Sequence, residues 1–333
     1  MKKIAILVFF TVGFFVHVWA CTGLIAGKQA TVDGSVLVTY SADSHTLYGA
    51  LTSSPAADWP KGSMRSIVEW DTNKPLGEIE QVEHTYAVIG NMNEHQLTVV
   101  ESTWGGRPEL VDTTGIIDYG SLMQLALERA KTAREAIKVM TGLVKKYGYY
   151  SSGESFTIAD PNEAWILDLI GKGPGRRGAV WVAVRIPDDC IAGHANYPRI
   201  HKIPMDDKEN CLYSPDVISF AREMGYFDGL NKDFSFARAY SPADFGALRA
   251  CDARVWSFFR KYDSTMDNYL PYVNGESAEP FPLYVKPSRK LSVQDMKEAM
   301  RDHFEDTPFD MTQDVGAGPF KVCLLYTSPS PRD

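Results

Sequence analysis

The order of the elements expected from the sequence predicts an α+β fold. Strands come first, two amphipathic helices follow, and more strands and then more helices complete the chain. There is no strand–helix–strand alternation of the kind that builds a parallel sheet, so sheets and helices are expected in separate layers. The chain has 333 residues, 44% of them hydrophobic, which is enough to bury the core of one large domain or two small ones.

Residues 1–20 have the pattern of a secretory signal peptide. A short positive segment precedes an almost unbroken apolar run, and Val18 and Ala20 occupy positions −3 and −1 of a cleavage site. We therefore expect export to the periplasm or the extracellular space, with Cys21 as the first mature residue.

A cysteine at a mature N-terminus carries its own base. A free α-amine has a pKa of about 7.7 to 8.0 and a thiol of about 8.5, so the amine can take the thiol proton near neutral pH. Cys21 is thus a candidate nucleophile. Its position alone also allows a structural or disulfide cysteine, or a lipoprotein cysteine, although Trp19 fits a lipoprotein signal poorly. Lipidation would block the thiol and the amine, so the lipoprotein and nucleophile interpretations exclude each other.

The composition makes some partners and cofactors unexpected. The formal net charge is −8 without a lysine or arginine run, so nucleic acid is not an expected partner. No apolar stretch after Cys21 approaches the roughly 18 residues that span a bilayer. The histidines and cysteines lack metal-site spacing, and we expect no metal or other cofactor. Export would permit disulfides, for which Cys190, Cys211 and Cys251 are the candidates.

The expected elements follow from local patterns. Apolar and β-branched runs predict strands over residues 22–28, 35–40, 84–89 and 97–101. Apolar residues at helical spacing predict helices over residues 121–131 and 133–147, with Thr132 and Glu135 as a capping box between them. A four-stranded meander is expected next, over residues 155–159, 164–170, 179–186 and 190–192.

Turn and cap signals separate these elements. Asp33-Gly34 predicts a hairpin turn between the first two strands. The glycine-rich stretch over residues 171–178 joins two strands and lacks a Lys-Ser/Thr ending, so it is interpreted as a hairpin loop and not as a phosphate-binding loop. Ser214 and Ser241, each followed by proline, predict helix N-caps.

Three further residues are candidates for the site, each with a plainer alternative. Asp43 follows the second strand and could reach the Cys21 amine, or it is a solvated loop acid. Asn196 could donate its amide to an oxyanion, or it caps a turn before proline. Arg254 lies beside an apolar helical stripe and needs an anionic or carbonyl partner, or its end reaches solvent or a salt bridge. An oxyanion donor or a simple turn is also possible for residues 90–95.

The end of the chain differs in character from what precedes it. After the stretch ending at Phe320, residues 323–333 form a Ser/Pro-rich segment without periodicity. We expect a domain over residues 21–320 that is incomplete at its C-terminus, and a non-native tail over residues 321–333.

Five groups of short motifs follow one another along the chain: Cys21-Thr-Gly-Leu-Ile-Ala-Gly-Lys28, Asp33-Gly-Ser35, His84-Thr-Tyr-Ala with Asn93-Glu94-His95, His194-Ala-Asn196, and Ala253-Arg-Val-Trp256. In this order, directly after a signal peptide, they resemble the dipeptidase A and secernin-like family of N-terminal-nucleophile (Ntn) cysteine peptidases. That family is distantly related to penicillin V acylase and bile salt hydrolase. The resemblance covers the mature chain up to Phe320.

The resemblance implies a four-layer αββα Ntn-hydrolase sandwich, truncated at the C-terminus, and residue roles within it. Cys21 would be nucleophile and base, Asp43 would orient the terminal amine, Asn196 would supply an oxyanion donor, and Arg254 would lie against the nucleophile. One position departs from the pattern, because Tyr40 stands where relatives commonly have an arginine, three residues before the aspartate. A tyrosine brings no permanent charge, so thiolate stabilisation would fall more on the remaining arginine, or substrate choice would differ.

The sequence therefore predicts a secreted cysteine dipeptidase that hydrolyses dipeptides or short peptides through Cys21. An Ntn amidase of the bile-salt or penicillin V type would use the same centre with a different pocket. A non-catalytic surface lipoprotein lipidated at Cys21 is the alternative from another class. The expected partner is a peptide substrate, and the sequence gives no indication of oligomeric state.

Overall fold

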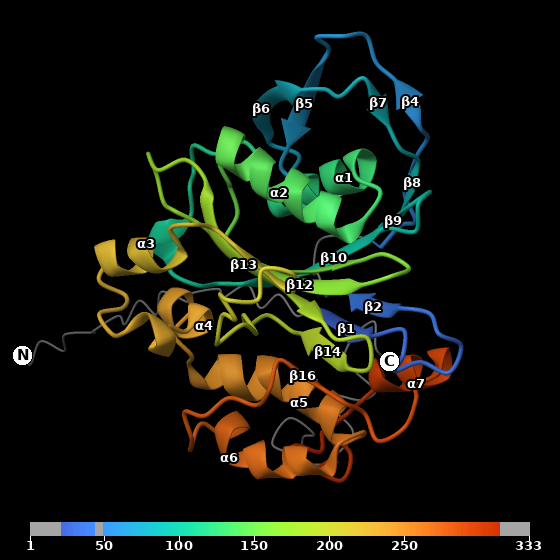
Figure 1. Ribbon diagram of the computed structural model, residues 1–333, viewed down its shortest axis with the longest axis vertical. Coiled ribbons are helices and arrows are strands. Elements are labelled where there is room, and N and C mark those ends of the chain that lie inside the picture. Colours follow the sequence, from blue (N-terminus) through green and yellow to red (C-terminus); the bar gives the residue numbers. More distant parts are fainter. Residues whose placement is uncertain (1–20, 44–48, 314–333) are drawn as a thin grey trace, which may run out of the picture.

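The computed structural model describes residues 21–43 and 49–313 (Figure 1). The expected signal peptide over residues 1–20 and the expected tail over residues 321–333 lie outside the described residues, as does the last stretch of the expected domain.

Groups of strands and groups of helices follow one another along the chain. The strands are β1 (Thr22–Ala26), β2 (Leu37–Ser41), β3 (Ser53–Ser54), β4 (Ala57–Asp58), β5 (Met64–Val68), β6 (Pro75–Glu80), β7 (His84–Thr85), β8 (Val88–Ile89), β9 (Met92–Asn93), β10 (Thr98–Trp104), β11 (Gly153–Ala159), β12 (Ala164–Gly171), β13 (Ala179–Ile186), β14 (Ile191–His194), β15 (Cys211–Tyr213) and β16 (Tyr284–Val285). The α-helices are α1 (Tyr119–Arg129), α2 (Ala133–Tyr147), α3 (Val217–Glu223), α4 (Phe236–Tyr240), α5 (Ala253–Arg260), α6 (Leu270–Val273) and α7 (Val293–Ala299).

The larger sheet has eight strands in the order β15-β13-β12-β11-β10-β9-β8-β3, and its pairings are antiparallel. The three long hairpin-connected strands β11, β12 and β13 confirm the first part of the expected meander. The fourth expected strand is present as β14, but its place in this meander is wrong. After a turn in which Cys190 N bonds to Pro187 O, the chain crosses to the other sheet, where β14 finds an antiparallel partner in β1.

The smaller sheet has the order β16-β14-β1-β2, which places β1 between two partners. The predicted pairing of the first two strands is confirmed, with Thr22 opposite Ser41. The connection is longer than a tight hairpin turn at Asp33-Gly34, because β1 ends at Ala26 and β2 begins only at Leu37. Every residue of β1 is buried, so the segment that follows Cys21 is held firmly in the sheet.

Helices pack on the outer faces of the two sheets (Figure 1). Helices α1 and α2 cover the larger sheet through a core that includes Leu122, Met140 and Phe156. Helix α5 lies below the smaller sheet, where Val255 packs in one core with Leu24 of β1. A third apolar cluster joins residues of the two sheets to each other. This mixed architecture of helices and antiparallel sheets confirms the predicted α+β class.

The helix signals in the sequence are partly confirmed. Thr132 does cap α2, because its side chain accepts the backbone N–H of Glu135 at 3.3 Å. The Glu135 carboxylate, however, accepts the N–H of Lys131 and not that of Thr132, so the capping box is incomplete. The two serine–proline N-caps are wrong. Ser214 Oγ accepts a strand N–H from β13, and Ser241 ends α4. Asp244 performs the capping that was expected of Ser241.

Two further expectations concern cysteines and the membrane. Cys190, Cys211 and Cys251 are free thiols, so the disulfide candidates do not pair with one another. Within residues 21–43 and 49–313, no helix combines the length and the apolar character needed to cross a bilayer.

Candidate active site

The strand register places Cys21 beside Asn196. In the pairing of β1 with β14, Gly23 lies opposite His194, and continuing this register by two residues brings Cys21 opposite Asn196. The backbone nitrogen of Cys21 donates to Asn196 Oδ1 at 2.7 Å. In the uncleaved chain this atom is a peptide nitrogen. Cleavage after Ala20 would convert it to an α-amine.

Asn196 is fixed by its backbone and by its hydrogen bonds. Its φ of +56° lies in the left-handed region, which asparagine tolerates better than most residues. Oδ1 accepts from Cys21 N and from Arg254 Nη2, while Nδ2 donates to the carbonyl oxygen of Thr103 at 2.5 Å. Because donors face one end of the amide and an acceptor faces the other, the network sets its orientation. The Nδ2 group is therefore engaged by the protein.

Arg254 joins the start of β1 to the loop after β14. It lies in the first turn of α5, directly after a π-helical segment over Ala247–Asp252, a feature often found at functional sites. Its guanidinium donates to Cys21 O at 2.7 Å, Thr22 Oγ1 at 2.8 Å, Ala195 O at 3.2 Å and Asn196 Oδ1 at 2.8 Å. A lysine could not make this set of contacts, because only the planar guanidinium presents its donors in a fixed fork.

The thiol of Cys21 is buried beside a carboxyl group. Its Sγ lies 3.8 Å from Glu101 Oε1, and the hydroxyl of Tyr40 donates to the same oxygen at 2.5 Å. Burial raises the pKa of the Cys21 thiol well above its ordinary value, and the negative charges of Glu101 and Glu154 raise it further. A hydrogen bond from the backbone N–H of Asp43 to the sulfur lowers the thiol pKa and opposes this rise only in part. The thiol of the uncleaved chain is therefore protonated at neutral pH.

Neighbouring strands bring two buried glutamates together. Thr103 of β10 lies opposite Glu154 of β11, so Glu101, two residues along β10, lies diagonally across the same face. Glu101 is 2% exposed and Glu154 is fully buried. Burial raises the pKa of both carboxyls, and the charge of Glu101 raises the pKa of Glu154 further. Such a pair retains a proton at pH values where isolated glutamates have lost theirs.

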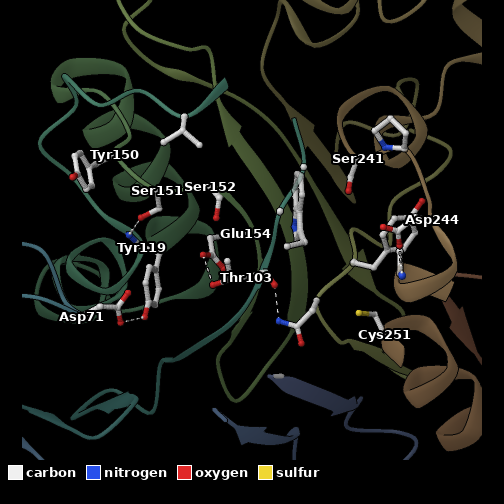
Figure 2. A pocket seen from close by; sticks show the side chains of 18 of the residues that line it. Asp71, Thr103, Tyr119, Tyr150, Ser151, Ser152, Glu154, Ser241, Asp244 and Cys251 are labelled. Atoms are coloured by element: carbon white, nitrogen blue, oxygen red, sulfur yellow. Dashed lines mark hydrogen bonds between the residues drawn. The ribbon is translucent and has the colours of Figure 1, made fainter. Parts of the chain in front are cut away.

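Two cavities adjoin these residues. One has a volume of about 550 Å³ and is lined by Cys21 and Glu101. The other, of about 700 Å³, is lined by Glu154 and Asp71, and Tyr119 lines both. Figure 2 shows Glu154 between Thr103 and Tyr119. The hydroxyl of Tyr119 donates to Asp71 Oδ1 at 2.8 Å. The sulfur and the paired carboxyls are therefore next to spaces large enough for a small molecule.

The structure brings all four site residues predicted from the sequence to one place. Cys21, Asn196 and Arg254 form one hydrogen-bonded group, and Asp43 lines the cavity beside the thiol with its backbone directed at the sulfur. The nitrogen of Cys21 donates to the amide of Asn196, the residue expected to bind an oxyanion. No cluster of three or more potential metal ligands is present in the part of the chain that the structure describes.

Sequence reasoning missed Glu101 and Glu154 and noticed Tyr40 only as a departure from the family pattern. A signal for the two glutamates was available. Both lie inside strands whose other residues are mostly apolar or small, and a carboxylate in a buried strand is costly unless it is paired or functional.

Comparisons with known proteins identify the family of this chain. The family model described as Peptidase family C69 matches residues 20–321. The chain is 28% identical over 318 residues to a probable dipeptidase of Salmonella dublin, an alignment that covers 87% of this chain and 68% of that protein. It is 25% identical to dipeptidase A of Lactobacillus helveticus, covering 89% and 64%, and 24% identical to a dipeptidase of Bifidobacterium longum, covering 89% and 61%.

The chain thus spans about two thirds or less of the length of the relatives it matches, while the family match extends over nearly all of the described residues. The match begins at the residue before Cys21, the cysteine that the fold places against Asn196 and Arg254. On this evidence the chain belongs to peptidase family C69.

Proposed function

We propose that this protein is an exported cysteine dipeptidase whose nucleophile is the mature N-terminal residue Cys21. The observation that carries the proposal is the 2.7 Å contact between the Cys21 nitrogen and Asn196 Oδ1, with the sulfur of the same residue lining a cavity. A nitrogen held by an acceptor keeps its lone pair oriented, and after cleavage it can serve as the base for the adjacent thiol. The names of the relatives, all dipeptidases or probable dipeptidases, support the substrate class.

In the proposed acylation step, the α-amine of Cys21 takes the thiol proton as the sulfur attacks the peptide carbonyl. A C–S bond forms and the carbonyl oxygen becomes an oxyanion. The ammonium group then returns the proton to the leaving nitrogen as the C–N bond breaks, which leaves a thioester. Water hydrolyses the thioester with the amine again as the base, and the thiol is restored.

The geometry favours a different role for Asn196 from the one that the resemblance implies. Its Nδ2 group donates to Thr103 O, whereas its Oδ1 receives the Cys21 nitrogen, so we assign Asn196 to the amine. Backbone N–H groups beside the sulfur are better placed for the oxyanion, and that of Asp43 already interacts with the thiol. Arg254 acts as a positioning residue, because its guanidinium holds Cys21 O and the Asn196 amide.

The packing order also supports the finer fold proposal. Helices α1 and α2, the larger sheet, the smaller sheet and helix α5 follow one another across the molecule (Figure 1). We interpret this order as the αββα sandwich of Ntn hydrolases, with Cys21 at the start of an inner strand.

The test compares matched cysteine variants of the exported protein on a panel of dipeptides. Intact mass should show a chain that begins at Cys21. Cys21→Ala should abolish hydrolysis, while Cys211→Ala, which removes another buried thiol that lines neither cavity, should retain it. A mature start other than Cys21, a lipid-sized mass increment, or undiminished activity of Cys21→Ala would refute the proposal. Hydrolysis of acylated amides in place of dipeptides would favour the acylase alternative.

A further inference from the structure

The buried carboxyl pair next to the thiol has no role in the mechanism above. Glu101 Oε1 receives the Tyr40 hydroxyl, and Glu154 Oε1 receives the Thr103 hydroxyl at 2.7 Å. The other oxygens, Glu101 Oε2 and Glu154 Oε2, are buried and receive no hydrogen bond from a third described residue. The two carboxyls hydrogen-bond to each other, which requires a proton between them. A ligand that brings a positive charge and several hydrogen-bond donors could take the place of that proton.

The cavity beside Glu154 is acidic. Glu69, Asp71 and Asp244 line it together with Glu154, and no lysine, arginine or histidine is among its described lining residues. Figure 2 shows Asp71 and Glu154 on either side of Tyr119. The walls therefore favour a cationic group, and within residues 21–43 and 49–313 the potential ligands are not grouped as a metal site would require.

The distance to the sulfur identifies which cation fits. In an unblocked dipeptide the α-nitrogen is two bonds from the attacked carbonyl carbon, a separation of about 2.5 Å by standard backbone geometry. The carbonyl carbon approaches the nucleophile to about 3 to 3.5 Å before reaction. The α-nitrogen must then lie within about 6 Å of the sulfur. Glu101 Oε1, at 3.8 Å from Sγ, occupies this region.

We propose that the Glu101–Glu154 pair, assisted by Asp71, is the binding site for the α-ammonium group of the substrate, so that the enzyme requires a free N-terminus. This inference rests on the proposed peptidase function and specifies its substrate class. An ammonium group carries three donors, enough for Glu101 Oε2 and Glu154 Oε2 once the shared proton has left, and for one further acceptor. An N-acylated substrate would place a neutral amide against these carboxyls and leave them without a charged partner.

Binding of the ammonium also changes the surroundings of the nucleophile. The charges of Glu101 and Glu154 raise the thiol pKa of Cys21 in the free protein. A bound cation offsets these charges, so the thiol gives up its proton more readily when the correct substrate is present. The proton shared by the carboxyl pair is displaced by the ammonium and leaves to solvent, so binding releases up to one proton.

The first experiment measures selectivity with L-alanyl-L-alanine and its N-acetyl derivative. We expect the wild-type enzyme to prefer the free dipeptide in kcat/KM by at least about a hundredfold, since a charged hydrogen-bonded contact is lost in the derivative. Glu154→Gln should reduce that preference at least about tenfold, and Asp71→Asn should reduce it in the same direction. Asp160→Asn is the matched control. It also converts a buried carboxyl to an amide, directly after the last residue of β11 and outside the lining of both cavities, and should leave the preference unchanged.

Each outcome has a defined meaning. Equal hydrolysis of both compounds by the wild-type enzyme overturns this inference and leaves the peptidase function intact, whereas hydrolysis of neither overturns both. If Glu154→Gln slows both substrates equally and keeps the preference, the pair acts on the chemistry and the ammonium site is refuted.

A second measurement does not depend on turnover. Calorimetric titration of L-alanyl-L-alanine into Cys21→Ala, in two buffers of different ionisation enthalpy, reports proton release on binding. We expect release in Cys21→Ala, weaker binding without release when Glu154→Gln is added, and no binding of the acetylated compound. Equal binding of both compounds, or binding without release in Cys21→Ala, would overturn the proposal.

Discussion

The backbone nitrogen of Cys21 donates to Oδ1 of Asn196 at 2.7 Å, across the register of two antiparallel strands. The contact does not depend on a flexible side chain for its donor, because the nitrogen belongs to the backbone at the start of β1. The acceptor is equally fixed, since Arg254 donates to the same Oδ1 and the Nδ2 group of the amide donates to Thr103 O. If the chain is cleaved after Ala20, as we propose, the resulting amine would already lie against this amide.

Substitutions at Asn196 should separate the amide from the backbone conformation. Asn196→Gly removes the amide and suits a φ of +56°, whereas Asn196→Ala removes the amide and forces alanine into the left-handed region. We expect both variants to lose at least about a hundredfold in kcat/KM. Asn196→Ala should be less stable than Asn196→Gly by about 1 kcal/mol in urea unfolding. Wild-type activity in either variant would contradict the assignment of the amide to the amine.

Arg254→Lys should impair catalysis more than folding. Lysine keeps the charge but cannot contact Cys21 O and the Asn196 amide with the same fork. We expect kcat to fall about tenfold to a hundredfold, with a stability loss of about 1 to 3 kcal/mol because carbonyl partners are left unsatisfied. Arg260→Lys, at the other end of α5, is the control and should match the wild type in both measurements. Equal effects of the two substitutions would show that Arg254 has no special positioning role.

The alkylation rate of the Cys21 thiol should depend on whether the nitrogen of the same residue is a free amine. In a chain that keeps one extra residue before Cys21, the nitrogen is an amide, and burial with the nearby carboxylates keeps the thiol pKa high. In the mature chain, the α-amine can accept the thiol proton. We expect iodoacetamide to modify the mature Cys21 at least about tenfold faster at pH 7.5, measured by mass spectrometry after digestion. Equal rates at this residue would show that the amine does not act on the sulfur.

His194 should contribute a measurable pH dependence of stability. It lies between the hydroxyls of Ser102 and Thr157, and burial lowers its pKa from 6.5 to about 3. As the pH falls below about 6.5 the unfolded chain binds a proton that the native state does not, so stability is lost between about pH 6.5 and 3. His194→Gln lacks this titration. Between pH 6 and 4, the unfolding free energy of this variant should fall by about 1.4 kcal/mol per pH unit less than that of the wild type.

Urea unfolding at pH 7, 6, 5 and 4 gives the comparison. Parallel curves for the wild type and His194→Gln would mean that the ring is protonated in the native state too, against the lowered pKa. The difference between the curves is the informative quantity, because Asp168, whose pKa burial raises to about 6, acts with the opposite sign in both proteins.

Local patterns in the sequence were sufficient for much of the fold. The apolar, β-branched runs over residues 22–28 and 35–40 predicted β1 and β2. The helical spacing before and after Thr132 predicted α1 and α2 within two residues at each boundary. The strand β14 was found, but not its partner. Periodicity records which residues are buried and does not record which of two sheets buries them.

The sequence indicated site residues whose role follows from their type and position in the chain. It did not indicate roles that depend on which residues become neighbours in the fold. Cys21 was singled out because cleavage of the expected signal peptide would give it an α-amine. The roles within the group depend on atoms: which end of Asn196 meets the nitrogen is decided by Thr103 and Arg254, both distant in sequence. The pairing of Glu101 with Glu154 arises from strand register, which the sequence does not reveal before the partners are known.

The position of Glu101 against the Cys21 sulfur affects how readily that sulfur is oxidised. Peroxides oxidise thiolates to sulfenic acid far faster than they oxidise thiols. In the uncleaved chain, burial and a carboxylate 3.8 Å away keep the sulfur in its protonated, less oxidisable form. We therefore expect the uncleaved chain to resist peroxide at Cys21 better than a mature chain whose α-amine can take the thiol proton.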